Sequence, residues 1–247
     1  MDWNADLYEE RHGFVAEYGK GLLEFVRPDP GQAILDLGCG TGTLTAELAS
    51  RAGQVVGIDA SPQMVETAKR NFPAVGFLVA DALELPFENR FDTVFSNAVF
   101  HWLPDHDRLL KNIRRALKPG GLLVCEFGAR GNVGAIEDAF ARTCEERGLR
   151  YRSPFTFPEA DTFARLLSAN RFTPEIVTEY DRPTILKEGE SGLANWMRQF
   201  FAADLQPMSE SQRQSILRRA EELARPKLWN GSAWVADYRR LRVVAHI

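Results

Sequence analysis

The chain has 247 residues, of which 45% are hydrophobic, so it can form one large domain or a domain with an inserted cap. Its net charge of -4 argues against a nucleic-acid surface, because proteins that bind duplexes usually present a basic face. Three cysteines without metal-ligand spacing, no apolar run of membrane length and no N-terminal secretion signal predict a cytoplasmic protein without a membrane partner or a bound metal.

The first thirty residues predict one or two helices. Large apolar side chains recur there at roughly helical spacing, at Tyr8, Val15, Tyr18, Leu22 and Phe25. We therefore expect residues 1–30 to form a helical lid beside a binding site.

Residues 34–43 combine a short apolar run, an acid and three glycines at alternate positions. A strand that passes through such a loop into a helix presents free backbone N–H groups to a ligand. Gly42 comes one residue too early for the dinucleotide fingerprint, and no lysine follows it as a phosphate-binding loop requires. Asp36 lies two residues before Gly38, where it disfavours a pyrophosphate and suits a ligand with an ammonium group. A glycine-rich turn without a ligand is the simpler alternative.

Strands and helices alternate through the next hundred residues. We expect strands at 55–59, 77–80, 91–96 and 122–127, and helices around 62–68, 109–117 and 133–144. This alternation predicts a parallel sheet with helices on both faces, which binds its ligands at the carboxyl ends of the strands. Asp36, Asp59, Asp81 and Asn97 all fall at or just past such ends.

The last third of the chain breaks this rhythm. Residues 176–180 and 239–245 read as two further strands, separated by roughly 50 residues with helical periodicity around 193–197 and 215–224. A segment of this length is too long for a bare loop in a compact domain. We expect a helical cap inserted between the last two strands.

The acids at the strand ends have a chemistry in common. Asp59 can accept hydrogen bonds from both hydroxyls of a ribose, although a dinucleotide enzyme would place an acid similarly. Asp81 and the N–H of Ala82 can pair with the amine and a ring nitrogen of adenine. Each acid taken alone is also explained as a helix cap or turn residue. Chance is a much weaker explanation for three acids after three successive strands.

From Ile34 to about Leu123 the chain resembles the class I S-adenosylmethionine (SAM) methyltransferases. The glycine loop, the ribose acid, the adenine acid and the fourth-strand segment 91–94 all match that family's motifs. More narrowly, the chain is similar to the trans-aconitate methyltransferase type of small-molecule enzyme. That second similarity is carried by Trp3, Asn4 and Tyr8 and by the segments 96–98 and 102–106. The cap resembles uncharacterised relatives instead, so the acceptor does not follow from the resemblance.

The resemblance implies SAM as the cofactor and S-adenosylhomocysteine as its product. It implies a Rossmann-like, doubly wound α/β fold with a seven-stranded, mostly parallel sheet whose last strand is antiparallel. The SAM-binding core would cover 31–182, the cap 183–232 and the final strand 233–247. The cofactor-binding residues would be Tyr8, Asp36, Gly38, Cys39, Gly40, Gly42, Asp59, Ala60, Met64, Asp81, Ala82, Asn97 and Ala98.

The segment after the fourth strand also excludes a substrate class. Methyltransferases that act on adenine or glutamine amino groups carry Asn/Asp-Pro-Pro-Tyr/Phe there. This chain has neither proline between Asn97 and Phe100. Together with the acidic charge balance, this argues against methylation of bases in DNA or RNA.

Methyl transfer makes modest demands on the protein, because the sulfonium methyl is already activated. Much of the rate can come from alignment and exclusion of water. A carboxylate acceptor needs no base, whereas a phenol, alcohol, ammonium or carbon acid does. His101 is the best candidate base because its ordinary pKa lies near neutrality. Its position between Phe100 and Trp102 also fits a packing or substrate-shaping role.

We expect the cap to select the acceptor. Trp196, Phe200 and Phe201 could line an apolar pocket. Arg182 or Arg130 could pair with an acidic group, and Trp102 could border the acceptor. Alternatively, the aromatic residues belong to the hydrophobic core of the cap and the arginines are exposed to solvent. Tyr238 is interpreted as a core anchor.

The primary hypothesis is a SAM-dependent methyltransferase acting on oxygen, nitrogen or carbon of a small molecule, as a monomer or weak homodimer. A non-catalytic SAM-binding module or sensor is the main alternative. A nicotinamide oxidoreductase is a third, which the glycine spacing opposes.

Overall fold

The computed structural model describes residues 14–247, without the side chains of 14–18 and 20. Tyr8 and the rest of the expected lid before residue 14 lie outside the described residues. The chain divides into two units. The sheet unit contains the residues through 128 with 158–179 and 241–247, and the helical unit contains 129–157 and 180–240. The helical unit thus takes in 129–157, which we had expected in the core; the expected domain boundaries stay a prediction.

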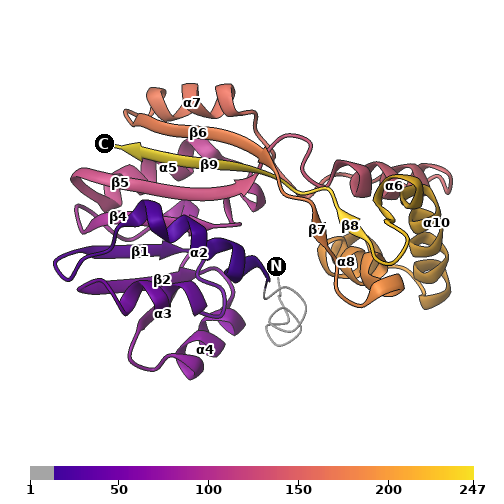
Figure 1. Cartoon of the computed structure of the whole chain (residues 1–247), viewed down its shortest axis with the longest axis horizontal. Coiled ribbons are helices and arrows are strands. Elements are labelled where there is room, and N and C mark those ends of the chain that lie inside the picture. The colour runs from indigo at the N-terminus through magenta and orange to yellow at the C-terminus, as the bar shows by residue number, and fades with distance from the viewer. Residues whose placement is uncertain (1–13) are drawn as a thin grey trace. The chain divides into compact units, whose positions relative to one another are not determined.

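A seven-stranded sheet forms the centre of the sheet unit, in the order β3-β2-β1-β4-β5-β9-β6 (Figure 1). β1 pairs in parallel with β2 and β4, β2 with β3, and β4 with β5. This arrangement confirms the predicted Rossmann-like sheet. The strands are β1 (Ala33–Leu37), β2 (Gln54–Asp59), β3 (Gly76–Val79), β4 (Phe91–Asn97), β5 (Leu117–Gly128), β6 (Thr173–Asp181) and β9 (Arg239–His246).

The last strand, β9, runs antiparallel to its neighbours, as expected. Ile247 N–H donates to the Gly121 carbonyl, and Ala129 N–H donates to the Arg239 carbonyl, each at 3.0 Å. Residue numbers therefore rise along β5 in the direction in which they fall along β9, which defines an antiparallel pair.

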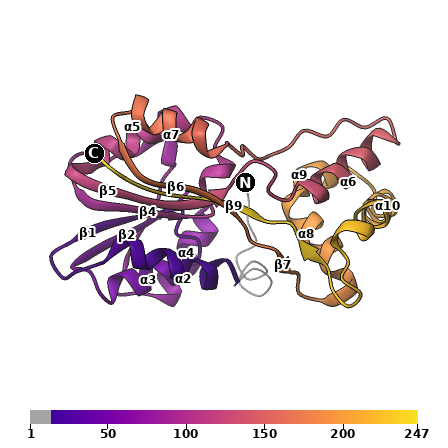
Figure 2. The same cartoon turned by 45° about the horizontal axis from the view of Figure 1, so that its top comes forward.

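Helices cover both faces of the sheet (Figure 2). On one face, Leu22, Leu44 and Phe95 belong to a buried cluster that joins α2 and α3 to the strands. On the other face, Phe127 of β5 packs on Phe163 of α7, with ring centroids 5.1 Å apart. Alternation along the strands explains how one sheet supplies both layers. The helices are α2 (Phe14–Val26), α3 (Thr43–Ala49), α4 (Pro62–Asn71), α5 (His106–Ala116) and α7 (Ala160–Ala169), with 3₁₀ turns at Ala82–Glu84 and Phe100–Trp102.

The helical unit contains the predicted helices and a small two-stranded sheet that we did not expect. Its aromatic core includes Phe140 and Phe201, with ring centroids 4.5 Å apart. β7 and β8 pair antiparallel, with Thr184 opposite Ala236. The elements are α6 (Gly134–Glu145), β7 (Thr184–Ile185), a 3₁₀ turn at Gly189–Ser191, α8 (Gly192–Phe200), α9 (Ala202–Leu205), α10 (Glu210–Leu228) and β8 (Val235–Ala236).

Candidate active site

The glycine loop bends at the carboxyl end of β1 and closes over β2. The N–H groups of Gly38 and Cys39 both donate to the Ile58 carbonyl at 2.8 Å. Gly38 has φ +79°, and an added Cβ there would lie 2.1 Å from Cγ2 of Val99. Only glycine adopts this positive φ without strain and also avoids the overlap with Val99. At Gly40 an added Cβ meets no atom within 4 Å, so the loop keeps open space on that side.

Asp59 joins two loops through one carboxylate. Its Oδ2 accepts the Gly40 N–H at 3.0 Å, and its Oδ1 accepts the Ser61 N–H at 2.9 Å. Burial raises the pKa of this carboxyl, while the backbone hydrogen bonds oppose the rise. Next to it, Ala60 leads into α4, where Met64 is buried and its N–H is capped by Ser61 Oγ at 3.4 Å.

Asp36 is buried at the end of β1, where its Oδ2 accepts the Thr45 hydroxyl at 2.6 Å. Burial raises the pKa of this carboxyl to about 7; the Thr45 hydrogen bond opposes the shift and the Asp59 charge adds to it. The same buried surroundings, with both acids nearby, raise the pKa of the Cys39 thiol far above its usual value. The site thus holds coupled acids that a cationic group would stabilise in their charged form.

Asp81 follows β3 and caps the short turn after it. Its Oδ1 accepts the Leu83 N–H at 2.8 Å, and the neighbouring Ala82 is buried. This local hydrogen bond is made by one of the two carboxylate oxygens of Asp81. Contact of Asp81 and Ala82 with adenine stays a prediction.

At the end of β4 the backbone turns sharply. Ala98 has φ +61°, a left-handed conformation, and its N–H donates to the Glu126 carbonyl at 2.7 Å. The Asn97 side chain lies under α2, because an added Cβ on Gly19 would be 2.9 Å from its Nδ2. Helix α2 therefore approaches the carboxyl end of β4 closely, and Gly19 permits this approach because it has no side chain.

His101 is 7% exposed, in the turn after β4. Its Nδ1 accepts the Gly128 N–H at 3.2 Å, which requires the neutral ring to carry its proton on Nε2. In this geometry Nε2 carries a proton that it can donate and has no lone pair to accept one. The role of general base stays a prediction, and this tautomer fits a hydrogen-bond donor role. The Trp102 ring lies beside it, with centroids 5.4 Å apart.

Two of the expected acceptor-binding residues contact Tyr238 in the helical unit, and a third packs on one of them. Trp196 Nε1 donates to Tyr238 Oη at 2.6 Å, and the Arg182 N–H donates to the Tyr238 carbonyl at 2.7 Å. The Phe200 ring lies 4.5 Å from the Trp196 ring. Arg130 is exposed, between β5 and α6. We had interpreted Tyr238 as a core anchor only, and no local pattern marks it as the centre of this group.

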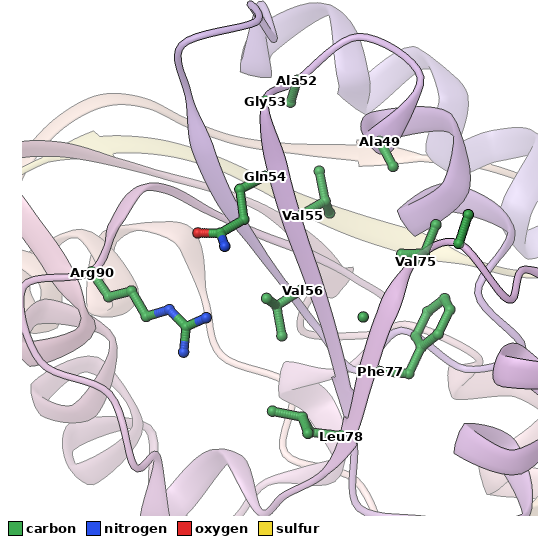
Figure 3. Close-up of a pocket in the computed structure, with 12 residues that line it drawn as sticks. Ala49, Ala52, Gly53, Gln54, Val55, Val56, Val75, Phe77, Leu78 and Arg90 are labelled. Carbon is green, nitrogen blue, oxygen red and sulfur yellow. The ribbon is translucent and has the colours of Figure 1, made fainter.

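A hollow of about 540 Å³ lies elsewhere on the sheet unit, along β2 and β3 (Figure 3). Gln54, Val56, Leu78 and Arg90 are among its lining residues. It extends over the amino halves of these strands, and no expected site residue of the described chain lines it. This hollow is therefore separate from the acids at the carboxyl ends.

Two further findings concern residues 14–247. No group of three or more His, Cys, Asp or Glu side chains in this part of the chain is arranged to hold a metal ion. Nor is any helix there long and apolar enough to cross a membrane.

Comparison with known proteins agrees with this geometry. The model of a methyltransferase domain matches residues 35–125. An uncharacterised methyltransferase of Schizosaccharomyces pombe, C70.08c, is 32% identical over 99% of this chain and 97% of its own length. Trans-aconitate 2-methyltransferase of Methylobacterium radiotolerans is 40% identical over 51% of this chain and 49% of the enzyme, so the chain spans about half the length of that relative.

Solved structures show the same fold. YcgJ of Bacillus subtilis superimposes with a TM-score of 0.67 at 16% identity, over 93% of this chain and 98% of YcgJ. The geranyl diphosphate C-methyltransferase of Streptomyces coelicolor, solved with S-adenosylhomocysteine, gives 0.58 at 15% identity, over 95% and 81%. The near full-length relative, the domain match and the sheet order agree. The chain belongs to the class I SAM-dependent methyltransferases.

Proposed function

We propose that the protein transfers the methyl group of SAM to an oxygen, nitrogen or carbon atom of a small-molecule acceptor, mainly by positioning the two reactants. The observation that carries this proposal is the Asp59 carboxylate, held between the Gly40 and Ser61 N–H groups at the sheet edge where β1 ends, one residue after Asp36. Gly40 and Ser61 donate to different oxygens of Asp59, and a carboxylate can accept further hydrogen bonds. Both ribose hydroxyls of the cofactor can therefore donate to this carboxylate.

The remaining residues fit the other parts of SAM. Asp36 has the charge and burial to balance the ammonium of the amino-acid tail. The open side of the loop at Gly40 allows close approach of that tail to the backbone. We assign the adenine to Asp81 and Ala82, which follow β3. When bound, SAM supplies an activated methyl group, so the protein's share is alignment and exclusion of water.

His101 supports an acceptor that arrives already ionised. A ring that keeps its proton on Nε2 can orient an anionic oxygen by donating to it. A carboxylate is ionised at neutral pH and needs no base, in contrast to an alcohol or phenol. Relatives named as trans-aconitate 2-methyltransferases make carboxylates the first acceptor class to test.

The experiment is titration calorimetry with SAM and S-adenosylhomocysteine, followed by a turnover assay. We expect Asp59→Asn to weaken S-adenosylhomocysteine binding by roughly tenfold or more, about 1.4 kcal/mol. Asp92→Asn is the matched control: Asp92 accepts the Ala33 N–H at 2.8 Å at the opposite end of the same sheet, and its loss should leave the affinity unchanged. No saturable binding by the wild type would refute the proposal. Binding without turnover of any carboxylate, amine or phenol would favour a SAM-binding module.

A further inference from the structure

A second hollow in the sheet unit has a strongly basic lining. Its volume is about 440 Å³, which is within the usual range for small-molecule sites. Four of its lining residues are cations, Lys111, Arg114, Arg115 and Arg171, and Glu88 is the one acid among the described residues that line it. The chain as a whole has a net charge of -4. The hollow therefore has the opposite charge to the protein that contains it.

The hollow lies at the amino ends of β4 and β5. Glu88 and Asn89 come just before β4, and Arg114 and Arg115 lie in the last turn of α5, just before β5. Arg171 follows the end of α7. The acids that we assign to the cofactor lie at or just past the carboxyl ends of β1, β2 and β3. Because these strands run parallel to β4, the hollow is at the opposite edge of the sheet.

Hydrogen bonds join the three segments that line the hollow. The Asn89 N–H donates to the Arg115 carbonyl at 2.9 Å, and Arg115 Nη2 donates to the Leu85 carbonyl at 2.5 Å. Asn170 Nδ2 donates to Asp107 Oδ1 at 2.9 Å, which joins the end of α7 to α5. The protein's own bonds therefore hold the lining in place, and this lowers the entropic cost of binding a ligand there.

The arginines of the hollow have no acid partner among the described residues. The Arg115 guanidinium donates to a backbone carbonyl, and neither Arg114 nor Arg171 forms an ion pair in the described part of the chain. Lys111 differs, because it pairs with Asp107 at 2.5 Å. Nε of Arg114 is buried and donates to no described atom. Buried N–H groups nearly always have an acceptor, so this one points to a ligand that supplies it.

The helix ends explain only part of this positive charge. Both α5 and α7 end at the hollow, and the carboxyl end of a helix carries about −0.5 elementary charge. The two ends together offset about one arginine charge, and Glu88 offsets another. The third arginine charge remains, so the hollow attracts anions even after the backbone is counted.

We propose that this hollow binds a small molecule through a phosphate group, which Arg114 and Arg171 contact. A phosphate fits better than a carboxylate, because it carries roughly two charges at neutral pH and has three oxygens that accept several guanidinium N–H groups at once. Inorganic phosphate, pyrophosphate and nucleotides share this group. The site is additional to the proposed methyl transfer, and its place at the amino edge of the sheet keeps it separate from the cofactor.

The test is calorimetry on the full chain in metal-free buffer. Inorganic phosphate, pyrophosphate and ADP are the phosphate probes, and acetate is the carboxylate probe. The variants are Arg114→Met, Arg171→Met and Glu88→Gln. Arg108→Met is the matched control, because Arg108 lies on α5 but pairs with Glu84 at 3.0 Å and does not line the hollow. Thermal unfolding checks that each variant folds.

We expect pyrophosphate to bind the wild type at least about tenfold more tightly than acetate. Arg114→Met and Arg171→Met should each weaken pyrophosphate about fivefold or more, while Arg108→Met leaves it within about twofold. Glu88→Gln removes the acid of the hollow and should tighten binding about twofold to threefold. If Arg114→Met does not fold, Arg171→Met and Glu88→Gln decide. Tighter binding of ADP than of pyrophosphate would support a nucleotide, and the reverse order a free pyrophosphate.

Several results would overturn the site. They are no saturable pyrophosphate binding up to about 10 mM, an equal loss in Arg108→Met, or unchanged affinity in both arginine variants. Competition between pyrophosphate and S-adenosylhomocysteine would place the anion at the cofactor loop instead. Tighter binding of a duplex oligonucleotide than of ADP would assign the basic residues to a nucleic-acid surface. None of these measurements depends on methyl transfer, so a failure of the proposed function would be a separate outcome.

Discussion

The proposed contact between Asp36 and the ammonium group of the cofactor would couple cofactor binding to pH. Burial raises the pKa of this carboxyl to about 7, so it is mostly protonated at about pH 6. An ammonium group binds the ionised form, so binding below pH 7 must release a proton. We expect the affinity for S-adenosylhomocysteine to be about tenfold higher at pH 8 than at pH 6.

Calorimetry at both pH values measures this difference, and Asp36→Asn serves as the control that subtracts the titration of Asp59, Cys39 and the ligand. The variant should bind weakly at both pH values. An identical pH dependence in the wild type and the variant would assign the effect to another group.

The same carboxyl destabilises the protein without ligand. Its pKa in the folded state lies above the unfolded value of 3.8, so between about pH 4 and 7 the unfolded chain binds fewer protons at this site. Its contribution to the free energy of unfolding therefore falls as pH rises through this window. Asp36→Asn should raise the melting temperature at pH 8 by several degrees, with little change at pH 4. Thermal unfolding at both values checks this, and a lower melting temperature at pH 8 would contradict it.

The His101 tautomer can be measured without knowing the acceptor. The hydrogen bond from Gly128 N–H predicts an unprotonated Nδ1 and a protonated Nε2 at neutral pH. Nitrogen NMR of histidine-labelled protein distinguishes the two, and the signal missing from His101→Gln assigns the residue. A proton on Nδ1 would support the general-base hypothesis. Once an acceptor is found, His101→Gln should keep most of kcat and His101→Ala should lose about tenfold, because glutamine retains an N–H donor.

At the residue scale, the sequence predicted which side chains lie at the strand ends but not how they bond. Asp59 was expected to be an acid facing the ligand, and its position after β2 was readable locally. Its bonds to Gly40 and Ser61 arise only when β1 and β2 lie side by side in the sheet. The orientation of His101 depends on Gly128, 27 residues further on, so no local pattern contains it.

At the element scale, the turn from β1 into α3 depends on Gly38. Gly38→Ala should cost about 1–2 kcal/mol for its positive φ and about 1–3 kcal/mol more for the overlap with Val99. Gly40→Ala is the matched control: it has a positive φ of 54° but open space for the methyl group, so it should cost only about 1–2 kcal/mol. Urea unfolding of the unliganded variants measures both. Equal losses would show that the Val99 contact is unimportant, and Gly38→Ala/Val99→Ala should recover part of the difference.

Most strands and helices with strong periodicity were predicted, and elements too short to show it were not. Strands β1 to β6 and β9 carry apolar runs bounded by turn residues. Helix α7 was missed although its buried residues Phe163 and Leu167 have helical spacing. It lacks the usual signal at its start, since Glu179 of β6 accepts the Ala160 N–H at 2.6 Å and no side chain of its own caps it. β7 and β8 have two residues each, too few for any periodicity.

At the scale of the whole molecule, a buried ion pair fixes β9 in the sheet. Arg242 donates to Glu126 Oε2 through both Nε, at 2.9 Å, and a terminal nitrogen, at 2.8 Å. The Glu126 side chain is 1% exposed. Arg242→Met would leave a buried carboxylate without this partner, which should lower the free energy of unfolding by about 3–5 kcal/mol.

The exposed pair between Arg108 and Glu84 gives the control, since Arg108→Met should cost at most about 1 kcal/mol. Adding Glu126→Gln to Arg242→Met should restore part of the loss. Urea unfolding compares the four proteins, and a loss for Arg242→Met no larger than for Arg108→Met would contradict a structural role of the buried pair.

The sheet as a whole was predictable because parallel strands joined by helices follow few topological rules. Which segments of the chain make up the helical unit was not predictable. Helix α6 reads as an ordinary crossover helix after β5, yet it packs against α10, whose residues follow more than sixty positions later. Nothing near α6 in the sequence specifies such a distant partner.

The place of β9 between β5 and β6 has a consequence for biosynthesis. Asp181 at the end of β6 and Arg239 at the start of β9 are separated by 58 residues. At about 5–20 residues per second, a ribosome needs roughly 3–12 s to add them. During this interval β6 has been made but β9, the strand with which it pairs, has not. The nascent chain therefore exposes unpaired edges on β5 and β6. The second segment of the helical unit, 180–240, emerges almost entirely within this gap, and its translation time sets how long a chaperone would have to protect those edges.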